Sequence, residues 1–327
     1  MHGNNKWVLL FISGFTLAGC CRMKRGYTPP KPQDLVEEVR KRNARTRSLK
    51  AVVKADQFTD KGRVKLKVFL LVKKGGKLRF EATVVDNTVA VLASNGVRFT
   101  SIDFKKHVVY EGPASPCNIS RVFNIPLTGE QVAVVLMGGV PLLNHDEVSL
   151  KWDDCKGREV LRLRNKETGI VQKIYLRKRK GLWQIVGTRI KDKKGKTLLK
   201  LFSREFRRRA GVWVARWIHY VHPRRKADLL MRFKSQKLNV EIPEDAFSLN
   251  PPQGLKRRWL ECPPLPRLPF ESLSPDQETK KLGDAGIHQK SQPRVPNVDT
   301  DQKGVQVGKE TPSARPPEKK KKTSSSH

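Results

Sequence analysis

From about residue 48 the chain alternates apolar and polar residues with a period of two, as β-strands with one buried face do. Residues 63–70 read RVKLKVFL and residues 78–84 read LRFEATV. The pairs Gly75-Gly76, Asp86-Asn87 and Asn95-Gly96 mark turns between such runs. This pattern predicts an antiparallel meander with one apolar face and one basic face.

A second block of alternation follows residue 147. The expected strands span residues 148–153, 159–164, 170–178, 182–190, 197–206, 212–220 and 227–238. With the first block they make about a dozen strands, and sheets of that size usually curl. The fold class we predict is therefore mainly β, with one large bent antiparallel sheet that forms an unclosed β-barrel.

Helical patterns are few and short. Residues 34–43, DLVEEVRKRN, place Leu35, Val36 and Val39 on one face of a helix that Asp34 can cap. Between the two blocks, Thr128-Gly129-Glu130-Gln131 fits a capping box that precedes a short apolar helix. So few helices cannot cover the apolar face of a dozen strands, and we expect an apolar cavity with the short helices as its lid. The alternative is a filled core of aromatic side chains.

The N-terminus has the pattern of an export signal. Residues 7–18 are an apolar run that is too short to span a membrane, and the run ends in Leu17-Ala18-Gly19-Cys20. These four residues resemble the bacterial lipobox, which implies a covalent diacylglycerol on Cys20 and removal of residues 1–19. An ordinary signal peptide or a buried N-terminal strand is the alternative. Because Cys21 and not Asp follows Cys20, analogy with enterobacterial sorting favours the periplasmic face of the outer membrane.

The net charge of +36 is extreme for a globular protein. Such a surface attracts anionic lipid or another polyanion of the cell envelope, although any single basic run is commonly just a solvated face. A nucleic-acid partner is not expected for an exported protein. A cytoplasmic nucleic-acid binder with a misinterpreted N-terminus is the third interpretation of the chain.

The organisation that we predict has four parts. They are a signal peptide at 1–19, a lipidated tether at 20–32, a lipid-binding domain at 33–254, and a disordered tail rich in Pro and Lys at 255–327. Among five cysteines, Cys117 and Cys155 are the pair well inside the domain. A disulfide between them is one prediction, and two buried thiols is the other.

The stretch Phe123 to Leu142, FNIPLTGEQVAVVLMGGVPL, and the ending Ile242-Pro-Glu-Asp-Ala-Phe247 resemble the lipoprotein-localisation family of LolA and LolB. The resemblance spans roughly residues 33–254. It implies an unclosed antiparallel barrel that binds acyl chains of lipid or lipoprotein, in transport within the envelope. Applied to this chain, it implies groove residues Leu66, Val68, Phe80 and Val84 and lid residues Leu136 and Met137. One departure is the turn at Asp86-Asn87, which is tight and polar where LolB has a protruding loop with an exposed Leu.

No motif for catalysis appears. The sequence lacks H-E-x-x-H, G-x-S-x-G and a phosphate-binding glycine loop, and neither a metal nor a cofactor is expected. The polar trio His145-Asp146-Glu147 and the pair His219 and His222 are interpreted as surface polar residues. The leading hypothesis is thus a non-enzymatic lipid-binding lipoprotein. The competing hypothesis is a structural lipoprotein with a packed core, whose basic surface and tail tether anionic envelope components.

Overall fold

A computed structural model describes residues 23–59, 62–123, 125–261 and 268–271. The chain divides into two units, residues 1–277 and 278–327, and the second unit lies outside the described residues. Cys20, Cys21, the predicted signal peptide and most of the predicted tail also lie outside them. The description below concerns the first unit alone.

The strands form two blocks on either side of a helical insertion, as the alternation predicted. The first block contains β1 (Ser48–Thr59), β2 (Gly62–Lys73), β3 (Lys77–Val84), β4 (Asn87–Asn95), β5 (Arg98–Asp103) and β6 (Val108–Pro113). The second contains β7 (Glu147–Asp153), β8 (Arg158–Arg164), β9 (Val171–Arg179), β10 (Leu182–Lys191), β11 (Thr197–Arg209), β12 (Val212–His222) and β13 (Ala227–Leu238). A short strand, β14 (Lys256–Trp259), follows near the end of the unit.

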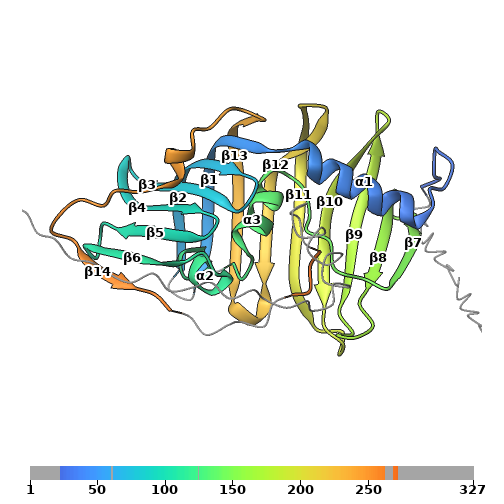
Figure 1. The fold of residues 1–327 in the computed structure, drawn as a ribbon. Coiled ribbons are helices and arrows are strands. Elements are labelled where there is room, and N and C mark those ends of the chain that lie inside the picture. The colour runs from blue at the N-terminus through green and yellow to red at the C-terminus, as the bar shows by residue number, and fades with distance from the viewer. Residues whose placement is uncertain (1–22, 60–61, 124, 262–267, 272–327) are drawn as a thin grey trace, which may run out of the picture. The chain divides into compact units, whose positions relative to one another are not determined.

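All fourteen strands belong to one sheet, in the order β14-β6-β5-β4-β3-β2-β1-β13-β12-β11-β10-β9-β8-β7 (Figure 1). The two blocks join through β1 and β13, which pair antiparallel over ten residues of each strand. Every neighbouring pair is antiparallel except β14 with β6, which is parallel. Within the described residues β7 and β14 remain the two edges, so the sheet does not close.

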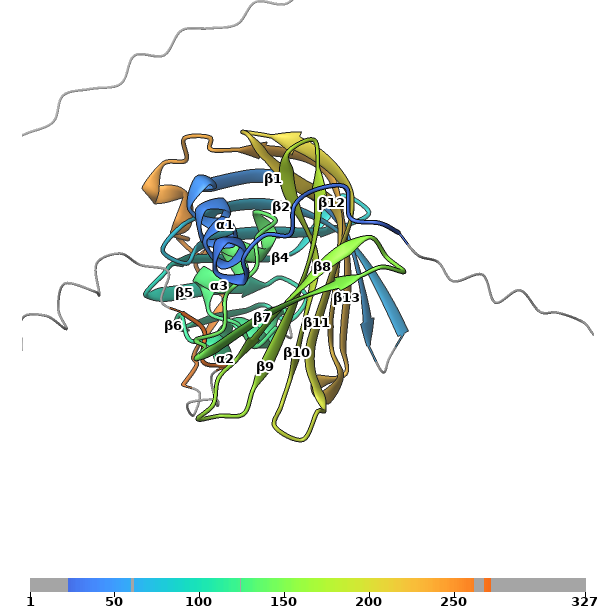
Figure 2. The ribbon, with the colours of Figure 1, turned by 90° about the vertical axis from the view of Figure 1, so that its right-hand side faces the viewer.

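Three α-helices accompany the sheet. These are α1 (Pro32–Arg45), α2 (Pro116–Phe123) and α3 (Gly129–Leu136), with 3-10 turns η1 (Pro223–Arg225) and η2 (Glu244–Phe247). The sheet curls around α1 and α3, which lie on its concave side (Figure 2). The predicted fold class, a mainly β protein with a large unclosed sheet and few short helices, is confirmed. None of the helices that the structure describes is both long and apolar enough to cross a bilayer.

The concave face holds two separate hydrophobic clusters. In one, Leu35, Val36 and Val39 of α1 pack on Leu161 and Leu163 of β8 and on neighbouring β9 and β10. In the other, α3 packs against β1–β4 and β10–β13. Helix α1 therefore fills the half formed by β7–β10, and α3 covers the other half together with Ile125 and Leu127 of the segment before it.

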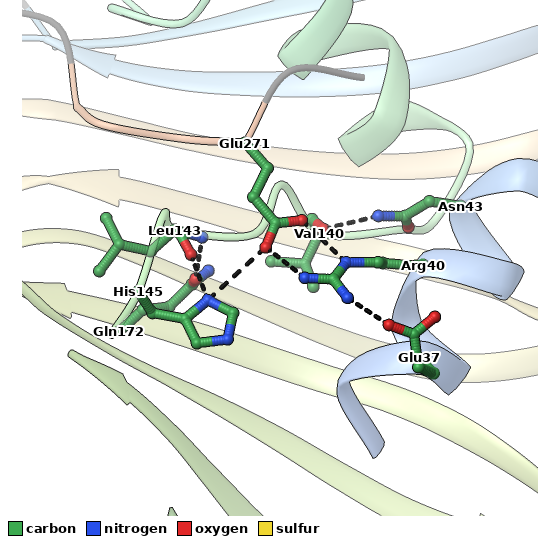
Figure 3. A network of polar contacts seen from close by, with 8 residues as sticks. All are labelled: Glu37, Arg40, Asn43, Val140, Leu143, His145, Gln172 and Glu271. Carbon is green, nitrogen blue, oxygen red and sulfur yellow. Dashed lines mark hydrogen bonds and ion pairs between the residues drawn. The ribbon is translucent and has the colours of Figure 1, made fainter. Parts of the chain in front are cut away.

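The chain beyond residue 254 is part of the fold, which corrects the predicted domain boundary. Strand β14 adds to β6, and Phe270 forms a bridge with Leu143. Glu271 accepts hydrogen bonds from Arg40 of α1 at 2.7 and 3.0 Å and lies 3.6 Å from Nδ1 of His145 (Figure 3). The predicted tail thus begins too early at 255, because charged β14 pairs with an edge strand about 150 residues away and its sequence shows no alternation.

The described part of the predicted tether also packs on the sheet. The carboxylate of Glu159, on the concave face of β8, is fully buried and accepts hydrogen bonds from Arg25 at 2.7 and 3.1 Å and from the Tyr27 hydroxyl at 3.1 Å. The Tyr27 ring packs edge-on against Trp152 and Trp183. Residues 23–27 are therefore docked, and a freely extended tether does not describe them.

Cys117, at the start of α2, takes part in a disulfide bond. Cys155 lies exposed in the turn after β7 and is not joined to Cys117. The predicted bridge between the two is wrong, and so is the alternative of two buried thiols. The strand order gives the reason: Cys117 follows β6 and Cys155 follows β7, and these strands lie near opposite ends of the sheet.

Candidate functional site

An apolar cavity lies under α3 on the concave face of the sheet. Its floor comes from β1–β4 and β12–β13, with side chains such as Val53, Leu70 and Met231. Val132, Val135 and Leu136 of α3 form its roof. Alternation explains most of the floor, because the lining residues of β1, β2, β3 and β13 lie two apart and, except for Gln57, are aliphatic or aromatic. In β4 the four consecutive residues 89–92 line it.

Four of the six groove and lid residues inferred from the sequence line this cavity. They are Leu66, Val68, Phe80 and Leu136. Val84 does not line it: it is the last residue of β3 and lies beyond Ala82, next to the turn at Val85 and Asp86. Met137 does not line it either: it caps the end of α3 and is buried in the core.

The predicted capping box starts the lid helix. The N–H of Gln131 donates to Oγ1 of Thr128 at 3.1 Å, and the N–H of Thr128 donates to Oε1 of Gln131 at 3.0 Å. Gly129 approaches the β2–β3 turn so closely that a Cβ there would lie 2.9 Å from the carbonyl oxygen of Gly76. Helix α3 is thus fixed at its N-terminal end against the turn of the neighbouring hairpin.

Arg42 fixes the other end of the lid. Its buried guanidinium donates from Nη2 to the Met137 carbonyl at 2.7 Å. Burial lowers the pKa of Arg42 to about 10, which still leaves it charged at neutral pH. A cation at the C-terminus of a helix is favourable, because the helix dipole is negative there. The lid is held at both ends by polar contacts, while its middle rests on apolar side chains.

The cavity has a volume of about 170 Å³ and is partly open. An engineered protein cavity of about 150 Å³ stays dry and binds benzene. The present conformation therefore has room for roughly six carbon atoms. A longer chain has to extend through the opening or displace α3.

Two polar side chains, Gln57 and Tyr220, belong to the otherwise apolar lining. Tyr220 of β12 lines the cavity with a side chain that is 1% exposed. No described residue accepts a hydrogen bond from its hydroxyl. Burial raises the pKa of Tyr220, which keeps the phenol protonated as a donor. Tyr220 occupies an inward position in a strand, where the sequence pattern indicates a core residue and does not mark a binding site.

Of the three histidines singled out in the sequence, His145 and His219 contact polar neighbours, while the buried Nδ1 of His222 has no described hydrogen-bond partner. His145 Nδ1 lies 2.8 Å from the Leu143 carbonyl, and His219 Nε2 lies 2.7 Å from a carboxylate oxygen of Asp228. His222 is buried near Arg224 and Arg225, and its pKa is lowered chiefly by burial. Among the described residues, no three side chains of His, Cys, Asp or Glu gather as metal ligands.

The turn between β3 and β4 is tight, as expected, but less polar. Val85 and Asp86 form it, and both have the positive φ of a two-residue hairpin turn. The side chain of Val85 is 89% exposed. The turn therefore displays a single apolar side chain, one residue before the predicted Asp86-Asn87.

This protein resembles known proteins in its structure but not detectably in its sequence. No protein-family profile and no curated protein matches the sequence. Solved structures that resemble this one include a DUF1329 family protein from Desulfovibrio piger, with 13% identity, a TM-score of 0.46, and coverage of 67% of this chain and 98% of that one.

Two further similar structures are of proteins named after lipoprotein sorting or LolA, the family that the sequence resembles. A putative outer membrane lipoprotein-sorting protein domain from Vibrio parahaemolyticus has 14% identity and a TM-score of 0.45, covering 66% of this chain and 97% of that one. A LolA superfamily protein from Nitrosomonas europaea has 12% identity and a TM-score of 0.46, covering 68% and 99%. These scores are low, so the fold is defined by the sheet order and the concave helices themselves, which are the features that the resemblance implied.

Proposed function

We propose that this protein binds an acyl chain of a lipid or lipoprotein in the cavity under α3 and acts in lipid or lipoprotein transport within the cell envelope. The observation that carries the proposal is the cavity itself. Apart from Gln57, its lining is aliphatic and aromatic on the side of the sheet and on the side of the helix. The role is one of binding, with no catalytic step.

Burial of hydrocarbon supplies the affinity. Each CH₂ removed from water contributes about 0.8 kcal/mol. About six carbons in the cavity therefore contribute roughly 5 kcal/mol before the cost of immobilising the ligand. Further carbons require movement of α3, so we expect affinity to rise with chain length and binding to be slow.

The test is binding of a fluorescent fatty acid to the purified protein, with Ala90→Phe as the variant. Ala90 lines the cavity, and a phenyl ring there fills much of it. Thr88→Phe is the control, since Thr88 is exposed in the same strand. We expect the Ala90 variant to bind at least tenfold more weakly and the control to bind as the parent does. Absence of binding by the parent, or equal binding by all three, would favour the structural lipoprotein with a packed core.

We further propose that Cys20 carries the anchor that holds the protein on the periplasmic face of the outer membrane. The support is the lipobox at residues 17–20 together with the apolar run before it. Labelled palmitate should enter the parent chain and not Cys20→Ser, and the variant should be released from the membrane fraction. Labelling of the Cys20 variant would contradict the assignment. The outcome is independent of the cavity.

A further inference from the structure

A second hollow, of about 860 Å³, adjoins the apolar cavity at one end of the sheet. Pro126 lines the hollow, while its neighbours Ile125 and Leu127 line the cavity. On β12, Tyr220 lines the cavity and His222 lines the hollow. Residues two apart on a strand face the same side about 7 Å from each other, so the two sites are contiguous on the concave face.

The hollow is basic, unlike the cavity. Three turns surround it, namely β8–β9, β10–β11 and β12–β13. They contribute five basic side chains and two acidic ones; the basic ones are Lys166, Lys193, Lys194, Arg224 and Arg225. Ile170, Leu198 and Leu268 also line it. An excess of positive charge over an apolar floor suits the head group of an anionic amphiphile.

Polar contacts within the turns hold this charge in place. Asp192 accepts N–H donors from Lys194 at 3.0 Å and from Lys196 at 2.9 Å, and it also pairs with Arg224. Gly169 packs against the next turn, since a Cβ there would lie 2.7 Å from the Cβ of Lys193. The β8–β9 and β10–β11 turns are thereby packed together, which brings Lys166 and Lys193 to one site.

Tyr220 and Arg225 lie where the two sites meet. Tyr220 lines the cavity, and Arg225, five residues further along the chain, lines the hollow. Arg225 also donates to Oγ of Ser120 at 3.3 Å. A buried hydroxyl without an acceptor costs about 1–3 kcal/mol, and an anion bound beside Arg225 would provide that acceptor. The arrangement supplies a neutral donor and a cation at the mouth of a hydrocarbon site.

We propose that the guest of the cavity is an anionic amphiphile with a phosphate-ester head group. Its hydrocarbon lies under α3, its phosphate lies in the basic hollow, and Tyr220 donates to a phosphate oxygen at the junction. This inference rests on the proposed function and names the ligand class. A phosphate monoester carries nearly two negative charges and three acceptor oxygens, which matches several basic side chains better than a single carboxylate does.

The experiment compares the binding of four probes to the purified protein. The protein carries Cys20→Ser, so that an acyl chain attached to Cys20 does not compete with the probes for the cavity. The probes are lysophosphatidic acid, oleic acid, monooleoylglycerol and glycerol 3-phosphate, and the readout is displacement of the fluorescent fatty acid or calorimetry. We expect lysophosphatidic acid to bind at least about tenfold more tightly than either other oleoyl probe, since one charge-assisted hydrogen bond accounts for such a factor. Glycerol 3-phosphate should bind far more weakly.

Variants locate the head group. Arg225→Gln and Tyr220→Phe should each reduce the preference for lysophosphatidic acid over monooleoylglycerol, by about tenfold and about fivefold. Each preference is a ratio of two affinities measured on the same variant, so a general change of the cavity affects both affinities and cancels. Arg207→Gln is the matched control. Arg207 is an exposed residue of β11 that lies outside the hollow, and its substitution changes the net charge as Arg225→Gln does.

The outcomes separate this inference from the proposed function. Equal binding of the three oleoyl probes overturns the head-group site and leaves acyl binding intact. The head-group site is also overturned if oleic acid binds as tightly as lysophosphatidic acid. The same holds if glycerol 3-phosphate, which has no acyl chain, binds as tightly. No binding of any oleoyl probe overturns both.

Discussion

At the scale of single residues, the unusual group is the hydroxyl of Tyr220, which is buried without a described acceptor. Tyr220→Phe keeps the ring and removes only the hydroxyl. Without ligand, we expect the free energy of unfolding to rise by about 1 kcal/mol, because a desolvated donor is removed. Urea unfolding of the two proteins measures this. A loss of stability of the same size would mean that the hydroxyl has an acceptor in the folded chain, and the argument for a ligand there would fall.

Individual cavity residues were predictable to the extent that strands alternate. Leu66, Val68 and Phe80 follow directly from the period of two. Val84 continues the same period of two but does not line the cavity, because it ends β3, and a period of two does not show where along a strand a cavity stops. Tyr220 was missed for a related reason: a buried phenol in a strand is common, and only the surroundings of its hydroxyl distinguish it.

At the scale of elements, local signals were found and non-local ones were not. The capping box at Thr128 and the hairpin turn at Asn95-Gly96 are encoded within a few residues, and both were confirmed. Helix α2 and strands β6 and β14 were missed. Strand β14 has the sequence KRRW with every side chain exposed, so its only reason to be a strand is the free edge of β6.

The capping box of α3 gives a prediction at this scale. Thr128→Ala removes the acceptor for the Gln131 N–H and should lower the free energy of unfolding by about 1 kcal/mol. Since the lid helix has only eight residues, its first turn should also open more often, which speeds exchange of bound fatty acid. Stopped-flow displacement and urea unfolding measure the two effects. Thr128→Ser retains the acceptor and should behave as the parent; a Ser variant as impaired as the Ala variant would rule out capping as the cause.

At the scale of the whole described unit, ion pairs fasten the first and the last described segments to the concave side of the sheet. Arg25 binds Glu159 near the N-terminal end, and Glu271 binds Arg40 near the C-terminal end. Met23 is further held by a hydrogen bond from its N–H to the Asp154 carbonyl at 3.0 Å. If Cys20 carries the lipid, only Cys21 and Arg22 lie between it and Met23, and the three Cα–Cα steps span at most about 10 Å. The β7–β8 turn would then be held next to the bilayer.

The ion pair at Glu159 tests this fixed orientation. Arg25→Ala leaves a fully buried carboxylate without its cation, and breaking such a pair costs about 3–5 kcal/mol. Because the Arg25 side chain is 22% exposed, solvent screening should reduce the loss to about 2 kcal/mol. Adding Glu159→Gln should recover much of the lost stability, since the neutral amide can still pair with the Tyr27 hydroxyl.

Urea unfolding of the single and double variants measures the coupling between Arg25 and Glu159. Arg63→Ala is the control, because the pair of Arg63 with Asp56 is more exposed and should contribute less than about 1 kcal/mol. If Arg25→Ala costs no more than Arg63→Ala, residues 23–27 are not held on the sheet, and an anchor at Cys20 would leave the domain free to turn on the membrane.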